Sequence, residues 1–210
     1  MKSPKTVKAL EELGRVRLSD SFFMRDFLHS EISEIEGIPN IPENPDLAIE
    51  VGKRLCENVL EPIQEKFGRI SIRSAYRSPS VNAKGAENRN QYNCARNEAN
   101  YAGHIWDYRD EDGFMGATAC IVVNRFISYY ESTGNWQALA WWIHDNIPEY
   151  SSMYFFPKLA AFNISWHERP KKTIKSHISG SKGILTKPGM DNFNGEHLNE
   201  YCEMLMELKL

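Results

Sequence analysis

ISIRSAYRSPSVN, residues 70–82, is the stretch from which the fold of this chain is best predicted. Apolar and polar residues alternate over 70–76, which predicts a half-buried β-strand. Pro79 has a restricted backbone and no N–H donor, so it fixes a turn after the strand. The stretch therefore predicts a strand followed directly by a turn.

An amphipathic helix is expected before this strand. Asn44 is a suitable N-cap and Pro45 occupies the first helical position. Apolar residues then recur at four-residue spacing, which gives the helix one face for a core. Pro62 and Gly68 are expected to mark its end. The apolar positions are Leu47, Val51, Leu55, Val59 and Ile63.

The residues upstream of that helix predict shorter elements. Residues 1–17 are expected to form a short helical arm. Ser19 or Asp20 is placed to cap a second short helix, which carries Phe22, Phe23 and Phe27. The prolines of IPNIPENP, residues 38–45, predict a loop because each one restricts its neighbour and lacks a donor.

The residues downstream of the turn predict further strands and a helix. Residues 78–112 form a long polar stretch, expected to be a functional loop. Apolar runs predict strands at 118–123, 152–156 and 161–166, the last two close enough to pair. Residues 136–147 show the pattern of an amphipathic helix. Together these elements predict an α+β fold, a small and largely antiparallel sheet with flanking helices.

The composition limits the cellular location and the classes of binding partner that we expect. A chain of 210 residues suffices for one sizeable core, and its net charge of −3 favours neither nucleic acid nor an anionic membrane surface as partner. The first residues are charged and lack the apolar core of a secretory signal, and no apolar run is long enough to span a bilayer, so a reducing cytoplasm is the expected location. The oligomeric state stays open. The cysteines form no CxxC pair, which argues against a zinc finger; they are Cys56, Cys94, Cys120 and Cys202.

SAYRSPSVN, residues 74–82, resembles the S-G-Y-R-S-P-x-x-N motif of the zinc D-alanyl-D-alanine carboxypeptidases, which share a fold with the hedgehog signalling domain. The segment 18–28 and the capped helix resemble the lead-in of that family. GATACIVV, residues 116–123, resembles its second strand, and AFNISW, residues 161–166, resembles its last strand. The resemblance covers residues 18–170 and implies a hedgehog/DD-peptidase domain. An N-terminal arm (1–17) precedes it, and a C-terminal strap with a short helix (171–210) follows it.

The resemblance also implies that the metal site of the family is degenerate here. In the family, zinc is held by H-x-x-G-x-A-x-D and by W-x-H, and a glutamate shortly before the last strand is the catalytic base. Aligned without gaps on Gly116, the first histidine falls on Gly113, the aspartate on Cys120 and the second histidine on Asn163. Residues 152–162 contain no carboxylate. Catalytic zinc needs three good donors and an open position, so no cofactor is expected.

A relocated zinc site is the alternative. His104 lies nine residues before Gly113, so a folded loop returns its imidazole to the vacated place. His104, Cys120 and one nearby carboxylate would then be chemically suitable ligands. The interpretation that we prefer is that the aspartates form a solvated turn and that His104 is a hydrogen-bonded loop residue. The carboxylates in question are Asp107, Asp110 and Asp112.

Cys120 is also a candidate catalytic nucleophile. A reactive thiol needs a neighbour that stabilises the thiolate, and His104 or His167 are candidates for that role. The competing interpretation is that Cys120, within an apolar strand, packs as a small hydrophobic residue. His144 lies inside a helical pattern and is expected to pack rather than to bind a ligand.

Arg77 is the main candidate for substrate binding. The resemblance implies that this arginine helps to hold the carboxylate of a peptide, a task that suits a planar guanidinium. A structural role, in which Arg77 satisfies carbonyls of the following loop, is the alternative. Five further residues are expected to bind substrate, with the same ambiguity between binding and structure: Ser74, Tyr76, Asn82, Asn163 and Trp166.

Three functions follow from these observations. The first is a zinc-less relative that binds a peptide or cell-wall fragment in the cleft around Arg77. The second is an enzyme that acts on peptidoglycan-type peptides, either as a metallopeptidase with relocated ligands or as a hydrolase that uses Cys120. The third is a structural component of a phage-like particle, for which a phage-associated location replaces the cytoplasmic one.

Overall fold

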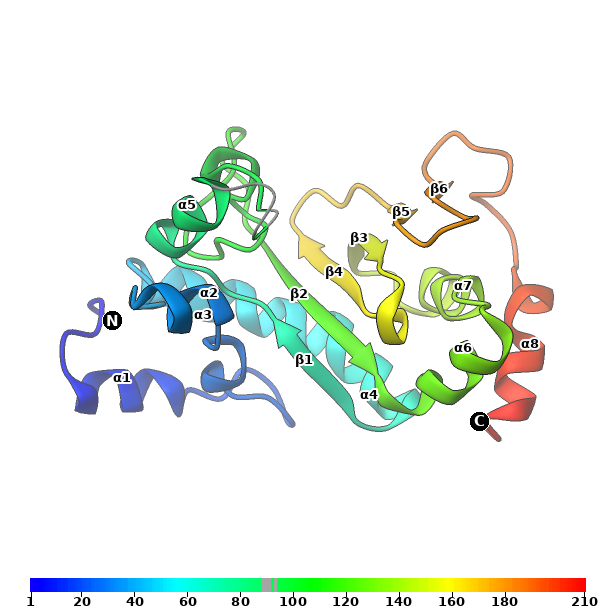
Figure 1. Cartoon of the computed structure of the whole chain (residues 1–210), viewed down its shortest axis with the longest axis horizontal. Helices are drawn as coiled ribbons and strands as arrows, with labels where there is room; N and C mark the ends of the chain where they lie inside the picture. The colour runs from blue at the N-terminus through cyan, green and yellow to red at the C-terminus, as the bar shows by residue number, and fades with distance from the viewer. Residues whose placement is uncertain (88–91, 93) are drawn as a thin grey trace.

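The computed structural model describes residues 1–87, 92 and 94–210. The described chain contains a six-stranded sheet with the strand order β1-β2-β4-β3-β5-β6 (Figure 1). Neighbouring strands are antiparallel except β3 and β5, which are parallel. The expected α+β class with a largely antiparallel sheet is therefore confirmed. The strands are β1 (Ile70–Ser74), β2 (Gly116–Val123), β3 (Tyr150–Phe155), β4 (Phe162–His167), β5 (Thr173–Ser176) and β6 (Gly183–Thr186).

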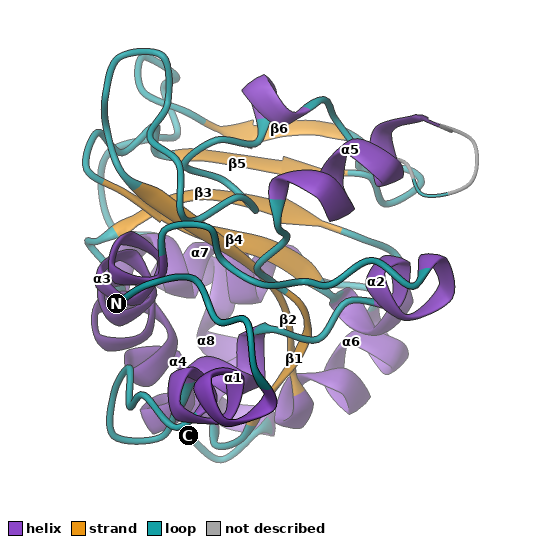
Figure 2. Ribbon diagram, turned by 90° about the vertical axis from the view of Figure 1, so that its left-hand side faces the viewer, coloured by secondary structure: helices purple, strands orange, loops and turns teal. Residues whose placement is uncertain are grey.

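Helices flank both sides of the sheet. They are α1 (Val7–Gly14), α2 (Glu31–Glu36), α3 (Pro45–Leu55), α4 (Glu61–Phe67), α5 (Pro79–Glu87), α6 (Ile127–Thr133), α7 (Gln137–Asn146) and α8 (Leu198–Glu207). Short 3₁₀ turns are η1 (Met24–Phe27), η3 (Asn97–Ala99), η4 (Asn124–Phe126) and η5 (Lys158–Ala160). Figure 2 shows α3, α4 and α7 on one side of the sheet and α5 on the other. Among the described residues, no helix combines the length and the apolar character needed to cross a membrane.

The helix expected between Asn44 and Gly68 is present, but it contains a π turn. Helix α3 continues into α4 through η2 (Cys56–Leu60), where the N–H of Glu61 donates to the carbonyl of Cys56. Pro62 explains this turn, because its ring and its missing N–H disfavour the regular α-helical bond at this point. Pro62 therefore lies inside the helix and does not end it; the end comes at Gly68, whose positive φ of 77° suits glycine.

The residues before α3 form different elements from those expected. Neither Ser19 nor Asp20 caps η1, because the N–H of Phe23 is instead satisfied by the carboxylate of Asp26 at 2.8 Å. Ser19 donates from its hydroxyl to Glu61 at 2.7 Å, which ties this segment to α4. Helix α2, which was not expected, precedes the prolines of the 38–45 loop.

The polar stretch 78–112 is not one long loop. Its first part forms α5, so the expectation of a loop is wrong for residues 79–87. Pro79 is tolerated there because the first turn of a helix has no partner for its N–H groups. The hydroxyl of Ser78 accepts from the N–H of Val81 at 3.3 Å and so caps the helix. Residues 88–91 and 93 lie outside the described residues.

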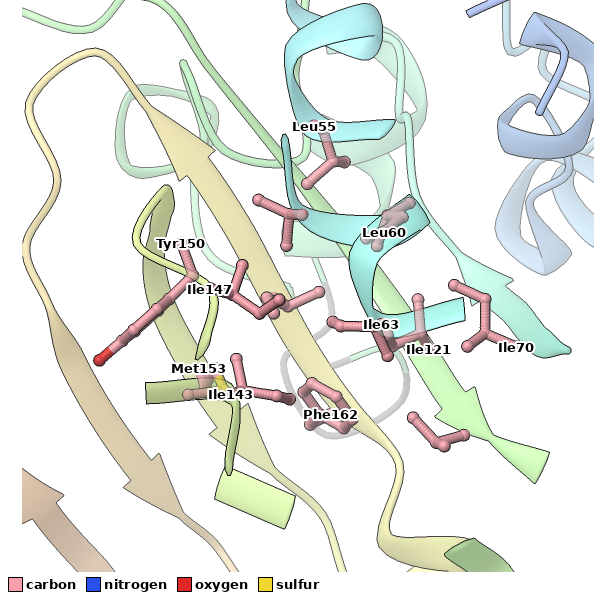
Figure 3. Packing of buried hydrophobic residues seen from close by; sticks show 14 of the residues in the cluster. Leu55, Leu60, Ile63, Ile70, Ile121, Ile143, Ile147, Tyr150, Met153 and Phe162 are labelled. Atoms are coloured by element: carbon pink, nitrogen blue, oxygen red, sulfur yellow. The ribbon is translucent and has the colours of Figure 1, made fainter. Parts of the chain in front are cut away.

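The hydrophobic core lies between the sheet and the helices α3, α4 and α7. Figure 3 shows Leu60 and Ile63 from the helical side facing Ile121 of β2 and Phe162 of β4. All of these side chains are fully buried. Burial of one such side chain contributes about 1.5–3 kcal/mol to stability, so this face anchors the sheet. The opposite face carries only a small separate cluster, which contains Cys120, Val122 and Ala161.

Residues 171–210 contribute to the sheet as well as to its surface. Strand β5 adds to β3 in parallel, and β6 pairs with β5 in the antiparallel sense. These two strands were not expected, because their short sequences show little alternation. The closing helix was expected and is present as α8, which packs against α7.

Candidate functional site

A row of polar side chains crosses the sheet on the face away from the core. Ser74 of β1 pairs with Cys120 of β2, Cys120 pairs with Asn163 of β4, and Asn163 pairs with Tyr154 of β3. Directly opposed residues of neighbouring strands project from the same face of a sheet. The alternate residue Ile121 belongs to the core, so the row faces the other way. The pairing of four strands thus fixes the positions of these side chains, and none of them lies in a loop.

The row forms one wall of a pocket of about 530 Å³. The remaining walls come from α2, from the turn after β1, from Tyr92 and from residues of the segment 94–104. The pocket brings together five of the residues singled out from sequence: Ser74, Arg77, His104, Cys120 and Asn163. The cleft expected around Arg77 is therefore a real feature of the molecule.

His104 reaches the pocket because its segment is attached to β2. The N–H of Thr118 donates to the carbonyl of Gly103 at 2.9 Å. Gly116 permits this close approach, because a Cβ there would lie 2.3 Å from the carbonyl oxygen of Ala102. His104 and Cys120 therefore line the same pocket.

The imidazole of His104 is buried and electrically neutral. Its Nδ1 donates to the carbonyl of Ala75 at 2.7 Å, which leaves Nε2 as the acceptor of the ring. Burial, and to a smaller extent the charge of Arg77, lower the pKa of His104 to about 3, although the hydrogen bond to Ala75 acts in the opposite direction. At neutral pH the pocket therefore has a hydrogen-bond acceptor at His104 and no positive charge there.

Arg77 provides a half-buried positive charge in a pocket that is also lined by the exposed Arg73 and by Glu31. Its Nη1 donates to Oδ1 of Asn82 at 3.0 Å and to Sγ of Cys94 at 2.8 Å. Burial lowers the pKa of this guanidinium, but arginine stays protonated in folded proteins. Within the described part of the chain, no carboxylate forms an ion pair with Arg77. The half-buried cation is thus held in place by neutral groups.

Asn82 positions this cation and does not itself line the pocket. Its side chain is fully buried, and its Nδ2 donates to the carbonyl of Ala95 at 3.1 Å and to Oδ1 of Asn97 at 2.9 Å. These bonds orient Oδ1 toward Arg77. In this structure Asn82 therefore supports Arg77 and is not among the residues that line the pocket.

Cys120 has the properties of a packing residue. Its side chain is buried beside Val122 and Ala161. Burial raises the pKa of the Cys120 thiol to about 11, although Arg73 and Arg77 act in the opposite direction. The thiol is therefore protonated at neutral pH, whereas a nucleophilic cysteine needs a thiolate.

The residues at the expected ligand positions do not fit a catalytic zinc ion. Gly113 has no side-chain donor and lies in an exposed turn, closed by its N–H to the carbonyl of Asp110 at 3.0 Å. Cys120 is a neutral thiol and Asn163 offers only an amide, whereas zinc prefers thiolate, imidazole or carboxylate. Over residues 1–87, 92 and 94–210, only His144, Asp145 and His197 form a group of three ligand-type side chains close enough to share a metal ion.

Asp107 is not available as a relocated ligand, because it holds the fold together. Its carboxylate accepts from the hydroxyl of Tyr76 at 3.1 Å and from the N–H groups of Glu43 at 2.7 Å and Asn44 at 3.2 Å. Burial raises the pKa of Asp107, and these bonds oppose that effect. Tyr76 is fully buried and donates to this carboxylate, and it is not among the residues that line the pocket.

The other two aspartates also lie outside the pocket. Asp110 contacts Nε2 of His167 at 3.1 Å, and Asp112 contacts Arg169 at 3.6 Å. These contacts place His167 away from Cys120, in a neighbouring groove. The structure therefore does not assemble His104, Cys120 and an aspartate as a metal site.

Neither Trp166 nor His144 lines the pocket: Trp166 belongs to the core face of β4, and His144 lies on α7. Strand alternation places Asn163 on the pocket face of β4 and Trp166 on the core face, where its indole N–H donates to Glu149 at 3.3 Å. Trp166, which was expected to bind substrate, therefore lies on the opposite face of the sheet from the pocket. His144 packs as expected, with its ring nitrogens bonded to the hydroxyl of Tyr150 at 2.6 Å and the carbonyl of Phe193 at 2.9 Å.

Several pocket residues were not foreseen from the sequence. Arg73 is the extra residue of a β-bulge between Ile72 and Ser74, and both Arg73 and Ser74 line the pocket as a result. Glu31 comes from the unexpected helix α2, and Cys94 from the polar stretch. Of these residues, only Tyr154 could have been predicted from the sequence, because pairing the two strands of the predicted hairpin places it beside Asn163.

Comparison of the chain with protein-family models, with curated proteins and with solved structures finds no match. The interpretation of the site therefore depends on its own geometry: on the Arg77 guanidinium, which forms no ion pair with the carboxylates that the structure describes, and on the row of side chains that crosses the sheet.

Proposed function

We propose that the protein binds a peptide through its terminal carboxylate in the pocket around Arg77. The observation that carries this proposal is the half-buried guanidinium, which lines the pocket and has no ion-pair partner among the described residues. A planar guanidinium recognises a carboxylate through parallel hydrogen bonds, and such bonds are stronger inside a partly desolvated pocket. A carboxylate is therefore the group that best matches this site.

The neighbouring side chains suit the backbone of a short peptide. Ser74 and Asn163 offer donors and acceptors along the row, and Nε2 of His104 is an acceptor for an N–H group. Tyr154 and Phe156 add aromatic surface at the far wall. A small number of polar groups beside apolar walls is typical of a pocket that binds one end of a ligand.

The resemblance to the zinc D-alanyl-D-alanine carboxypeptidases supports a peptide of cell-wall type. Two residues of the SAYRSPSVN motif, Ser74 and Arg77, line the pocket, and so do Cys120 and Asn163 at the expected ligand positions. The order of β1, β2, α7, β3 and β4 along the chain is the order that the hedgehog/DD-peptidase fold implies. We propose that fold for residues 18–170 on this basis.

Binding without zinc-dependent hydrolysis is the second part of the proposal. Its support is the chemistry of the donor set, in which a glycine, a neutral thiol and an amide replace three good zinc ligands. The remaining residues keep their ability to hold a peptide, because none of them needs a metal ion for its hydrogen bonds.

The carboxylate role is tested with two versions of one peptide. A D-alanine-terminated tripeptide with a free carboxylate is expected to bind at least about tenfold more tightly than its C-terminal amide, measured by isothermal titration calorimetry. Arg77→Lys keeps the positive charge but loses the planar guanidinium that makes parallel hydrogen bonds. It should therefore remove most of the difference in affinity between the acid and the amide. The matched control is Arg54→Lys on the exposed face of α3, which should leave it unchanged. Equal binding of acid and amide to the unmodified protein would overturn the proposal.

The absence of zinc hydrolysis is tested separately. Protein purified without chelator is expected to contain no stoichiometric zinc by elemental analysis, and incubation with the same tripeptide should release no D-alanine. One zinc ion per chain together with release of D-alanine would replace the binding function by a peptidase function.

A further inference from the structure

A second pocket lies beside the first on the same face of the sheet. It has a volume of about 670 Å³ and is formed by β3, β5, β6 and the chain that leads into β5. Tyr154 lines both pockets, and its neighbour in the parallel register is Lys175 of β5. Lys175 therefore continues the row that begins at Ser74 and passes through Cys120 and Asn163.

The second pocket is positively charged. Lys171, Lys175 and Lys182 line it, and none of its lining residues is acidic. All three lysines are exposed, and among the residues that the structure describes none of them forms an ion pair. The whole chain has a net charge of −3, so this concentration of cations is a local feature of the groove.

The charge pattern also gives the groove a direction. A third pocket, which shares Ser152 and Lys171 with the second, is lined by four carboxylates and by the cations Arg169 and Lys171; the carboxylates are Glu98, Asp110, Glu111 and Asp112. The second pocket thus combines three lysines with no acidic lining residue, whereas the third has an excess of carboxylates, so an anionic ligand held at Arg77 is attracted more strongly by the second. The favourable path for such a ligand therefore leads from Arg77 across Tyr154 to Lys175.

The length of this path follows from the geometry of the sheet. From β1 to β5 there are four steps between neighbouring strands, and at about 4.8 Å each they span about 19 Å. An extended peptide covers this distance with about six residues, at about 3.3 Å per residue. The row from Ser74 to Lys175 thus has about the length of a short extended peptide, and Arg77 lies in the turn that directly follows Ser74.

We propose that the second pocket binds an acidic side chain of the same peptide whose terminal carboxylate is held at Arg77. The ligand class is an extended acidic peptide with an aspartate or glutamate about six residues before its C-terminus. This inference rests on the proposed function of the first pocket. It adds a requirement on the ligand that binding at the first pocket does not impose: the peptide carries a second negative charge at a defined distance from its terminal carboxylate.

The test uses N-acetylated peptides of about seven residues that end in D-alanine and carry aspartate or asparagine at the first position. The aspartate peptide is expected to bind about fivefold more tightly than the asparagine peptide at low ionic strength, and the difference should shrink as salt is added. A third peptide, with aspartate at the central position, should show no such gain, because its charge then lies over the neutral part of the row.

Two charge-reversal variants locate the effect. Lys175→Glu with Lys182→Glu should abolish the preference for aspartate or invert it. The control, Lys2→Glu with Lys5→Glu, makes the same change of net charge in the exposed segment before α1 and should keep the preference. All of these lysines are exposed, and thermal unfolding of each variant checks that the fold is retained.

The outcomes separate the two proposals. If aspartate and asparagine peptides bind equally while the acid still binds better than the C-terminal amide, the second pocket is overturned and the proposed function stands. If acid and amide bind equally, the proposed function is overturned. A preference for aspartate that survives in the Lys175 and Lys182 variant, or that disappears equally in the control, also overturns the assignment.

Discussion

Arg77 and His104 are joined by a main-chain hydrogen bond, in which the N–H of Arg77 donates to the carbonyl of His104 at 2.8 Å. The ring of His104 makes a second bond to the same turn, at the carbonyl of Ala75. The cation of the pocket and its neutral acceptor are therefore fixed relative to each other before any ligand arrives. Such preorganisation lowers the entropy that binding has to overcome.

The buried imidazole of His104 predicts a specific dependence of stability on pH. Its pKa is about 3 in the folded protein, well below that of an unfolded histidine near 6.5. Between these values the unfolded chain binds more protons, so stability is lost as the pH falls, by up to about 1.4 kcal/mol per pH unit. His104→Gln removes this contribution, so its free energy of unfolding in urea should change less than that of the unmodified protein between pH 7 and pH 5. Identical slopes would contradict the neutral buried histidine.

The cysteines are expected to differ in their reactivity toward iodoacetamide. Burial raises the pKa of both Cys56 and Cys120, so neither should be labelled in the native protein at neutral pH. Cys94 is half-buried and accepts a hydrogen bond from Arg77, and Cys202 is half-buried on α8, so these two should be labelled first. Mass spectrometry of timed samples gives the order. Rapid labelling of Cys120 would restore its candidacy as a nucleophile.

Loss of Asp107 should destabilise the whole domain. Asp107→Ala leaves the hydroxyl of Tyr76 and the N–H groups before α3 without their acceptor, at an expected cost of about 3 kcal/mol. The measurement is the midpoint of urea unfolding. Asp112→Ala is the matched control, because its contact with Arg169 is exposed and should contribute less than about 1 kcal/mol. Equal effects of the two substitutions would show that the network around Asp107 carries no special weight.

The resemblance to zinc peptidases predicts the result of restoring two ligands. Cys120 and Asn163 are direct neighbours across β2 and β4, and His104 lines the same pocket. The double variant Cys120→Asp with Asn163→His is therefore expected to bind one zinc ion, measured by titration with a zinc-sensitive dye. Each single variant should bind zinc at least about tenfold more weakly. Failure of the double variant, if it is folded, would argue that the pocket does not have the geometry of the family.

His197 is expected to hold the C-terminal helix in place. Its ring stacks on Trp141 with centroids 4.0 Å apart, and its nitrogens bond Asp145 at 2.7 Å and the carbonyl of Asn192 at 3.0 Å. Loss of these contacts in His197→Ala should weaken the docking of α8 by about 2 kcal/mol, seen as faster amide hydrogen exchange in that helix. Glu203→Ala, at an exposed position of α8, is the control and should leave exchange slow. Unchanged exchange in His197→Ala would contradict this role.

Much of the fold follows from patterns that are local in the sequence. The alternation over 70–76, the apolar run at 118–123 and the hairpin strands were all visible because one face of each strand meets the core. Strands β5 and β6 were not visible, because their pairing depends on the edge of β3 more than on their own residues. Helix α2 is short and contains no buried residue, so it has no apolar stripe that could reveal it.

The candidate site was predictable where it depends on register and unpredictable where it depends on irregularity. Cys120 and Asn163 share the pocket because strand pairing requires it. Arg73 enters through a bulge, and a bulge has no reliable signature in one sequence. Trp166 could have been excluded by counting, since it stands an odd number of positions from Asn163 on the same strand.

The parallel pairing of β3 with β5 has a consequence for the order in which the chain folds. The connection from β3 to β5 contains β4, which pairs with the opposite edge of β3. The hairpin of β3 and β4 is a local structure and forms fast, whereas β5 has to wait until that hairpin presents an edge. The lysine-lined pocket is therefore expected to be the last part of the groove to assemble during synthesis, after the part around Arg77 is complete.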